Sequence, residues 1–217
     1  MSYLKNIRFF GLILSFMFLT FLGCSDENMI SDNNQSLESE LSLNSIPKSS
    51  EGEVPSSELQ FMREEEKLAR DIYQLMYSKY QLFVFRNISK SEQAHMNAIK
   101  VLLDRYAIED PVGSNGVGVF TNPELQSLFN SLKMQGDSSV ISALKVGAAI
   151  EEIDILDIKE ILMLGNLSAD VRFVLTNLMN ASKQHLRAFV GNLRVRGIIY
   201  SPQYLSQNEY NEIINRK

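Results

Sequence analysis

One segment of this chain places potential metal ligands inside the apolar face that a helix would bury. In the stretch "SEQAHMNAIKVLLDRY", residues 91–106, Glu92 and His95 are one helical turn apart and share a face with Ile99 and Leu102. A buried carboxylate is costly unless a partner compensates its charge. The chain must therefore fold so that other groups meet Glu92 and His95 in the interior.

Three further segments repeat this pattern of apolar residues at spacings of three and four with polar groups in the middle. The first predicted helix, 57–80, starts after Pro55, and the second carries the stripe described above from Phe85 to Tyr106. A third follows a predicted N-cap at Asp137, and a fourth follows Ser168 and ends near Gly197. The stripes of the first, third and fourth helices are Met62, Glu66, Ala69, Tyr73, Met76, Tyr80; Leu144, Gly147, Glu151, Asp154, Ile158, Ile161; and Val171, Val174, Leu178, Ser182, His185, Phe189, Arg196.

The connections predict how these helices are arranged. No segment shows sustained alternation of period two, so the fold class is predicted to be all-α. The links near Gln81 and over 165–168 are short, which makes each pair of helices antiparallel neighbours. The long segment 107–136, with a short helix after Pro123, joins the pairs. We predict a four-helix bundle with one long crossover between helices 2 and 3, and a short C-terminal helix.

The polar groups of the four stripes predict a metal site. Like charges buried together must protonate or bind cations, and four carboxylates balance two divalent ions, with two imidazoles completing the ligand set. Spacing from the hairpin turns places the groups of each hairpin at similar depths. The predicted ligands are Glu66, Glu92, His95, Glu151, Asp154 and His185.

Alternatives to this ligand set remain open. In the run 64–66 only one glutamate is expected to point inward, and Glu65 is the rival of Glu66. Glu152 is likewise the rival of Glu151. Ser89-x-x-Glu92 fits a capping box, which would leave Glu92 exposed in a first turn. Each histidine could also be an ordinary core or surface residue.

The N-terminal region predicts export and a lipid anchor. Residues 1–23 carry two basic residues and an apolar run of about 14 residues, shorter than the roughly 20 needed to span a bilayer, which is typical of a signal peptide. Cys24, the only cysteine, resembles the acylation site of a bacterial lipoprotein; a simple secretory signal or a buried cysteine is the alternative. We predict a flexible acidic tether over 24–58 and a helical domain over 59–217. From residue 59 onward acidic and basic residues are equal in number, which gives no electrostatic case for binding nucleic acid.

The motifs resemble the ferritin-like di-iron carboxylate superfamily. "EKLARDIY", "SEQAHMNA" and "AAIEEID" are similar to ligand segments of rubrerythrins. "EEEKLARDIY", "ALKVGAAIEEIDI", "HLRAF" and "SPQYLS" resemble more closely an uncharacterised prokaryotic ferritin-like family, the domain of unknown function (DUF) 2202. Where the superfamily has a second Glu-x-x-His, this chain has Ser182-x-x-His185. Either Asp154 supplies the missing carboxylate, or one metal position is weak or lost.

The resemblance implies an exported ferritin-like protein with a dinuclear centre of iron, or manganese, that oxidises Fe(II) with oxygen or peroxide. Tyr73 is a candidate for tuning the centre or relaying an electron. The predicted partners are metal ions, the membrane through lipidated Cys24, an external electron donor if the centre is redox-active, and a second copy in a homodimer. The predicted location is the cell envelope, at the outer membrane or cell surface. The alternatives are passive metal binding, or a metal-free adaptor that uses "SPQYLSQNEY" or the glycine-rich crossover.

Overall fold

The computed structural model describes residues 51–215, and its regular elements are all α-helices. Glu53 and Leu167 form an isolated bridge, and no strand occurs within 51–215. This confirms the all-α prediction. The helices are α2 (Ser56–Tyr80), α3 (Phe83–Arg105), α4 (Pro123–Gly136), α5 (Val140–Leu162), α6 (Ala169–Arg194) and α7 (Gln207–Asn215).

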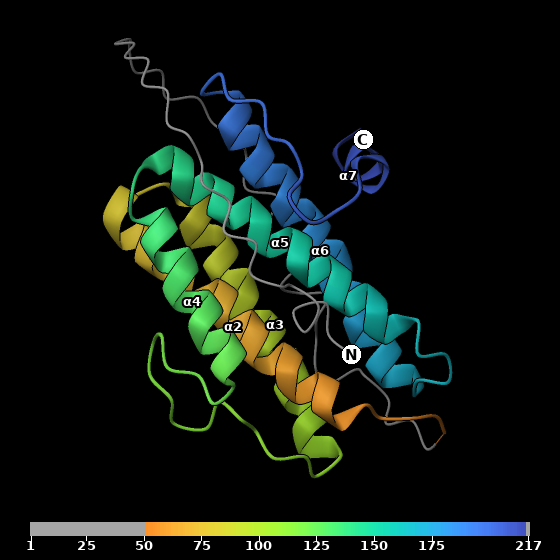
Figure 1. Cartoon of the computed structure of the whole chain (residues 1–217). Helices are drawn as coiled ribbons and strands as arrows, with labels where there is room; N and C mark the ends of the chain where they lie inside the picture. Colours follow the sequence, from red (N-terminus) through yellow and green to blue (C-terminus); the bar gives the residue numbers. More distant parts are fainter. Residues whose placement is uncertain (1–50, 216–217) are drawn as a thin grey trace.

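The helices are wired as two hairpins joined by a crossover (Figure 1). Helix α2 packs mainly against α3, and α5 mainly against α6. The first hairpin reverses within two residues because Gln81 adopts the left-handed conformation, with φ of 56°, and donates its N–H to Tyr77 O at 2.9 Å. The crossover contains α4, which packs against α2 and α5, and α7 lies against α6. The predicted bundle with one long crossover is confirmed.

Two helix starts differ from the predictions. Helix α5 is capped by Ser139, whose Oγ accepts the N–H of Ser142 at 3.0 Å, whereas Asp137 ends α4 and pairs with Lys133. The Asp137 N-cap prediction was therefore wrong, because that side chain is held by the preceding helix. Helix α2 starts at Ser56, one residue before the predicted start at residue 57.

The predicted signal peptide, Cys24 and most of the tether lie outside the described residues. Over the residues that are described, no helix combines the length and apolar character needed to cross a membrane.

The apolar core consists of two clusters with a polar layer between them. One cluster includes Tyr73, Phe85 and Phe189, whose rings pack with centroids 5.2–6.3 Å apart. The other lies toward the start of α2 and the end of α5 and includes Leu59 and Ile158. Helices α2, α3, α5 and α6 contribute polar side chains to this layer, which apolar packing encloses on two sides.

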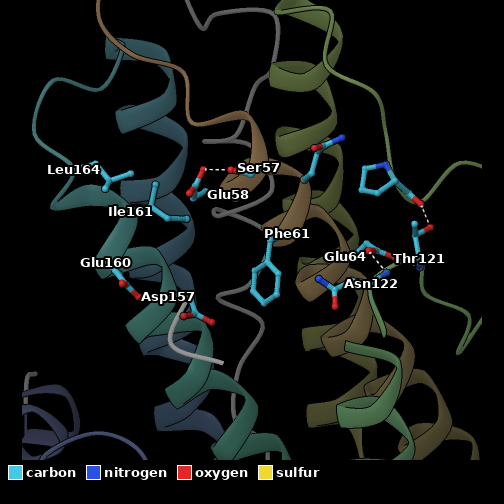
Figure 2. A pocket seen from close by; sticks show the side chains of 12 residues that line it. Ser57, Glu58, Phe61, Glu64, Thr121, Asn122, Asp157, Glu160, Ile161 and Leu164 are labelled. Carbon is cyan, nitrogen blue, oxygen red and sulfur yellow. Dashed lines mark hydrogen bonds between the residues drawn. The ribbon is translucent and has the colours of Figure 1, made fainter. Parts of the chain in front are cut away.

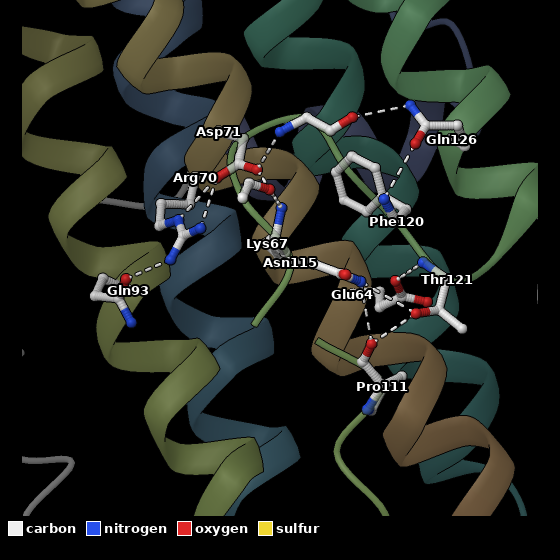
Figure 3. A network of polar contacts seen from close by, with 12 residues as sticks. Glu64, Lys67, Arg70, Asp71, Gln93, Pro111, Asn115, Phe120, Thr121 and Gln126 are labelled. Carbon is white, nitrogen blue, oxygen red and sulfur yellow. Dashed lines mark hydrogen bonds and ion pairs between the residues drawn. The ribbon is translucent and has the colours of Figure 1, made fainter. Parts of the chain in front are cut away.

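Acidic side chains on α2 hold the crossover in place (Figure 3). Glu64 accepts the backbone N–H groups of Thr121 and Asn122 at 2.5 and 2.9 Å. Asp71 pairs with the fully buried Lys67 at 2.5 Å and accepts the N–H of Gly118 at 2.9 Å. The glycine-rich crossover, one candidate partner surface in the adaptor hypothesis, is thus fastened to its own bundle.

Candidate metal centre

Three predicted ligands from the first hairpin meet in the polar layer. Nδ1 of His95 lies 2.8 Å from Oε2 of Glu92 and 3.1 Å from Oε2 of Glu66. All three side chains are at most 2% exposed. Glu92 lies well inside α3, about two and a half turns beyond its start at Phe83, so the capping-box alternative was wrong. We call Glu66, Glu92 and His95 the first triad.

A second triad shares Glu92 and takes its other ligands from the second hairpin. Nδ1 of His185 lies 2.9 Å from Oε1 of Glu92 and 3.4 Å from Oε2 of Glu151. In each triad one potential ligand atom per residue lies within 4.8 Å of the others. The two oxygens of Glu92 therefore face different triads, as a carboxylate bridging two ions would. We call the two triads together the carboxylate–histidine cluster.

Asp154 and Ser182 lie beside the cluster. The Ser182 hydroxyl donates to Oδ2 of Asp154, while Oδ1 of Asp154 is buried and accepts no hydrogen bond. Ser182 of α6 thus orients an acid from the neighbouring helix α5. Asp154 is absent from both triads, so its role as a ligand stays a prediction.

Tyr73 contacts the cluster through one ligand. Its hydroxyl donates to Oε1 of Glu151 at 2.6 Å, and the ring is fully buried. Burial and then the charge of Glu151 raise the pKa of Tyr73 well above its usual value, so the phenol stays protonated. Tyr73 therefore fixes the Glu151 carboxylate and leaves Oε2 to face His185.

The donor set fits a pair of cations, because several of its atoms have no hydrogen-bond partner. Oε1 of Glu66 and Oδ1 of Asp154 are buried without a hydrogen-bond partner, and Oε1 of Glu92 and Nδ1 of His185 lie 2.9 Å apart without hydrogen-bond geometry. Buried polar atoms are normally satisfied, so buried oxygens without a donor in this cluster favour the binding of a cation there. Carboxylate oxygens with one imidazole per position suit iron, manganese or zinc.

Burial and the neighbouring charges shift the pKa values of the cluster residues strongly. Burial raises the pKa of Glu66 to about 8, although His95 opposes the shift. Burial favours neutral His185, but Glu92 and Glu151 outweigh it and raise its pKa to about 10. Burial opposes the charge on Glu92, yet His185 and His95 hold its pKa well below the usual range. The cluster thus keeps protons among its buried carboxylates.

Ser91 is a site residue that the sequence prediction missed. Its Oγ lies 3.1 Å from Nε2 of His185 and 3.5 Å from Nε2 of His95. A hydroxyl oxygen can accept from two N–H groups, so Ser91 can hold both imidazoles with Nδ1 facing the carboxylates. In the sequence, this role of Ser91 could have been predicted only from its position one helical turn before His95. Ser91 and His95 also line a cavity of about 920 Å³ at the α3–α6 side.

The glutamate run of α2 differs from the prediction that only one member points inward. Glu64, Glu65 and Glu66 are all buried, with exposed fractions of 2%, 3% and 2%. Only Glu66 belongs to a triad; Glu64 binds the crossover, and Glu65 turns toward Asp157 and Asp154 of α5. The prediction failed because α3, α4 and α5 all pack against α2, which leaves it no solvated face in this region.

Glu152, the rival of Glu151, serves the C-terminal segment. Its Oε2 accepts the N–H groups of Gln203, Tyr204 and Leu205 at 2.7–2.9 Å, and its Oε1 accepts the hydroxyl of Tyr200 at 2.7 Å. Glu151, in contrast, lies in the second triad. The "SPQYLS" stretch is therefore bound internally by Glu152.

Fold and site together define an all-α bundle with a buried carboxylate–histidine cluster contributed by four helices. The family model described as "Uncharacterized protein domain (DUF2202)" matches residues 56–217, and the chain belongs to this family. An uncharacterised protein of Methanocaldococcus jannaschii, MJ0754, is 47% identical over 173 residues, which cover 80% of this chain and 93% of the relative. The crystal structure of the hypothetical protein MJ0754 matches with a TM-score of 0.75 and covers 80% of this chain and 98% of that one.

Proposed function

We propose that this protein binds two divalent metal ions, with iron as the physiological metal and manganese as the alternative, and that it oxidises Fe(II) with oxygen or peroxide. The observation that carries the proposal is the pair of triads that share Glu92, together with buried atoms of Glu66 and Asp154 that have no hydrogen-bond partner. In an acid cluster at the surface, water would form hydrogen bonds with such atoms. An ordinary surface cluster therefore does not account for buried atoms without a hydrogen-bond partner.

Each residue has a distinct task in this proposal. Glu66 with His95 would hold one ion, Glu151 with His185 the other, and Glu92 would bridge them. Asp154, oriented by Ser182, supplies a further carboxylate beside both positions. A bound pair of redox-active ions would supply electrons to one oxidant.

The protein around the cluster limits side reactions and positions protons. The two apolar clusters cover the polar layer on two sides. Tyr73 keeps its proton on the Glu151 side, and His95 and His185 release protons when their nitrogens take up metal.

Location and partners are part of the same proposal. A lipid on Cys24 would anchor the protein in the cell envelope, at the outer membrane or cell surface, with residues 25–50 as a spacer. Turnover requires an external electron donor, since Cys24 is the only cysteine and offers no thiolate cluster. A homodimer stays a prediction.

The test is metal uptake by the purified full-length protein, loaded anaerobically with Fe(II) or Mn(II) and then desalted. We expect two ions per chain, at most one in Glu92→Gln and in His185→Ala, and two in the control Glu212→Gln, whose exposed side chain lines the cavity beside Ser91. Absence of first-row metal from the loaded wild type would refute the metal proposal. Metal uptake without consumption of oxygen or peroxide would leave a passive metal binder.

A further inference from the structure

The charges of the bundle are divided between its two ends, although acidic and basic residues are equal in number from residue 59 onward. The end of α2 adjoins the end of α4, where the Tyr80 hydroxyl donates to Gly136 O at 2.8 Å. The start of α3 and the last turns of α6 lie at this same end, because the rings of Phe85 and Phe189 pack with centroids 5.6 Å apart (Figure 1). Five helix termini, including the start of α5, therefore share one end of the bundle.

This end is strongly basic. We call it the basic end and define it by residues 74–86, 131–145 and 190–200. Its single acidic residue, Asp137, pairs with Lys79 and Lys133. Its six basic residues are Lys79, Arg86, Lys133, Lys145, Arg194 and Arg196. Six positive charges against one negative charge leave the basic end with a net charge of +5.

Large apolar side chains are exposed among these charges. They are Phe83, Met134, Val195 and Ile199, with exposed fractions of 63%, 72%, 78% and 93%. The guanidinium carbon of Arg86 lies 4.5 Å from the centroid of the Phe83 ring, so a charge and an apolar ring are presented together. Positive charge next to exposed apolar side chains is the combination with which protein surfaces bind anionic lipid.

The opposite end of the bundle is acidic. We call it the acidic end; it holds nine acidic and four basic residues over the ranges 51–60, 100–112 and 157–173. Arg105 at the end of α3 pairs there with Asp170 at the start of α6. A pocket of about 380 Å³ opens at the same end, and Figure 2 shows Glu58 of α2 and Asp157 of α5 around it.

Charge, and not apolar exposure alone, distinguishes the two ends. Met163 and Phe173 are 75% and 48% exposed at the acidic end, so both ends present apolar side chains. An anionic surface would repel the acidic end and attract the basic end. The bundle therefore has one end suited to such a surface.

We propose that the basic end binds the surface of an anionic phospholipid bilayer, with its apolar side chains in the headgroup region and its lysine and arginine side chains at the lipid phosphates. The inference rests on the proposed location in the cell envelope, and it is independent of metal binding. A nucleic acid backbone offers no apolar layer for the exposed side chains. Contact between the opposite ends of two copies would match in charge, but it would not close and would build an open chain of molecules.

The proposal sets the orientation of the bundle on the membrane. The described chain begins at Glu51, at the acidic end, and the 25 residues of α2 extend over about 37 Å toward the basic end. The 26 residues over 25–50 span at most roughly 85 Å. A lipid on Cys24 is thus compatible with a bundle whose basic end faces the same membrane.

The test uses tryptophan as a local reporter, because the natural chain contains none. The full-length protein carries either Phe83→Trp at the basic end or Phe173→Trp at the acidic end, in each case with Cys24→Ser so that no lipid is attached. A local reporter is needed because the apolar run over 9–22 can itself bind vesicles.

We expect the emission of Phe83→Trp to shift to shorter wavelength with vesicles of phosphatidylglycerol and phosphatidylcholine, and to stay unchanged with phosphatidylcholine alone. The emission of Phe173→Trp should stay unchanged with both kinds of vesicle.

Charge reversal tests the electrostatic part of the inference. In the Phe83→Trp protein, Arg194→Glu with Arg196→Glu should raise the lipid concentration that gives half of the shift at least about tenfold. The control is Lys100→Glu with Lys159→Glu, the same change in charge at the acidic end. It should alter this concentration less than about twofold, because the distance to the basic end exceeds the screening length of about 10 Å. Circular dichroism checks that each variant is folded.

Each contrary outcome assigns the basic end differently. No shift of Phe83→Trp with anionic vesicles, or equal shifts of both reporters, would overturn the inference. A shift that grows with protein concentration in the absence of vesicles would make the basic end a contact between copies. A change of emission with duplex DNA but not with vesicles would make it a nucleic-acid site. None of these measurements needs bound metal or a lipid on Cys24, so they stand or fall separately from the proposed function.

Discussion

At the scale of single residues, the ring orientation of both histidines depends on the hydroxyl group of Ser91. Ser91 contacts Nε2 of both rings, and such contacts fix ring orientation and the nitrogen that faces a metal. We expect Ser91→Ala to weaken Co(II) binding about 10- to 100-fold, measured by competition with a chelator.

Ser89→Ala is the matched control for this substitution. Ser89 lies two residues earlier on the same helix and donates only to Arg86 O within the described contacts, at 3.0 Å. Its removal should leave Co(II) affinity within about twofold of wild type. Equal affinities for both variants would show that Ser91 does not position the imidazoles.

The ionisable ligands predict how the metal-free protein responds to pH. The raised pKa of Glu66 means that folding takes up a proton, so its contribution to stability falls as pH rises from 4.5 to about 8. For His185, folding stabilises the charged ring, and this contribution is complete below 6.5 and lost as pH rises to about 10. Both effects have the same sign.

We therefore expect the urea midpoint of the chelator-treated protein to increase when pH is lowered from 8 to 6.5. The metal-loaded protein should show a smaller change over this range, because bound cations replace the protons. A midpoint that does not vary with pH would contradict the clustering of these groups.

At the scale of helices, the contact between α5 and α6 requires a glycine. A Cβ at Gly147 would lie 2.5 Å from a ring carbon of Phe189, which is fully buried. We expect Gly147→Ala to lower the free energy of unfolding by about 1–3 kcal/mol, measured by urea denaturation.

Gly191 on α6 provides the comparison. Nothing lies within 4 Å of a Cβ added there, so Gly191→Ala should stabilise the helix by about 0.5–1 kcal/mol. A similar effect of the two substitutions would mean that packing of α5 on α6 is looser than the structure indicates.

The helices and most cluster members could be predicted from the sequence because apolar periodicity and hairpin lengths are local properties. The five triad residues were among the six predicted ligands for this reason. The roles of Glu64, Glu65 and Glu152 could not be predicted, since they depend on the crossover, on α5 and on the C-terminal segment, which are distant in sequence. Periodicity also assumes one buried face per helix, whereas α2 is buried on all sides over 62–69.

At the scale of the whole molecule, metal should act as a link between the hairpins. The second triad joins Glu92 of α3 to Glu151 of α5 and His185 of α6. A ligand that binds only the folded state adds about 2.7 kcal/mol at a concentration 100 times its dissociation constant. We expect Mn(II) to raise the thermal midpoint of the chelator-treated protein in a concentration-dependent manner.

Calorimetry with the Glu92→Gln variant checks the origin of this effect. Without the shared carboxylate the midpoint should depend much less on Mn(II), whereas Glu212→Gln should follow the wild type. Stabilisation by Mn(II) that survives the loss of Glu92 would place the ion elsewhere.

Because Glu92 belongs to both triads, the two triads would be completed at different stages of chain synthesis. Residues 66–95 alone contain the whole first triad, so a nascent chain has the groups for one ion as soon as its first hairpin has emerged. The second triad awaits α5 and α6, and it forms only when the two halves have docked. Occupancy of that later position would thus mark the completed molecule, and a chain stalled midway would carry a single ion.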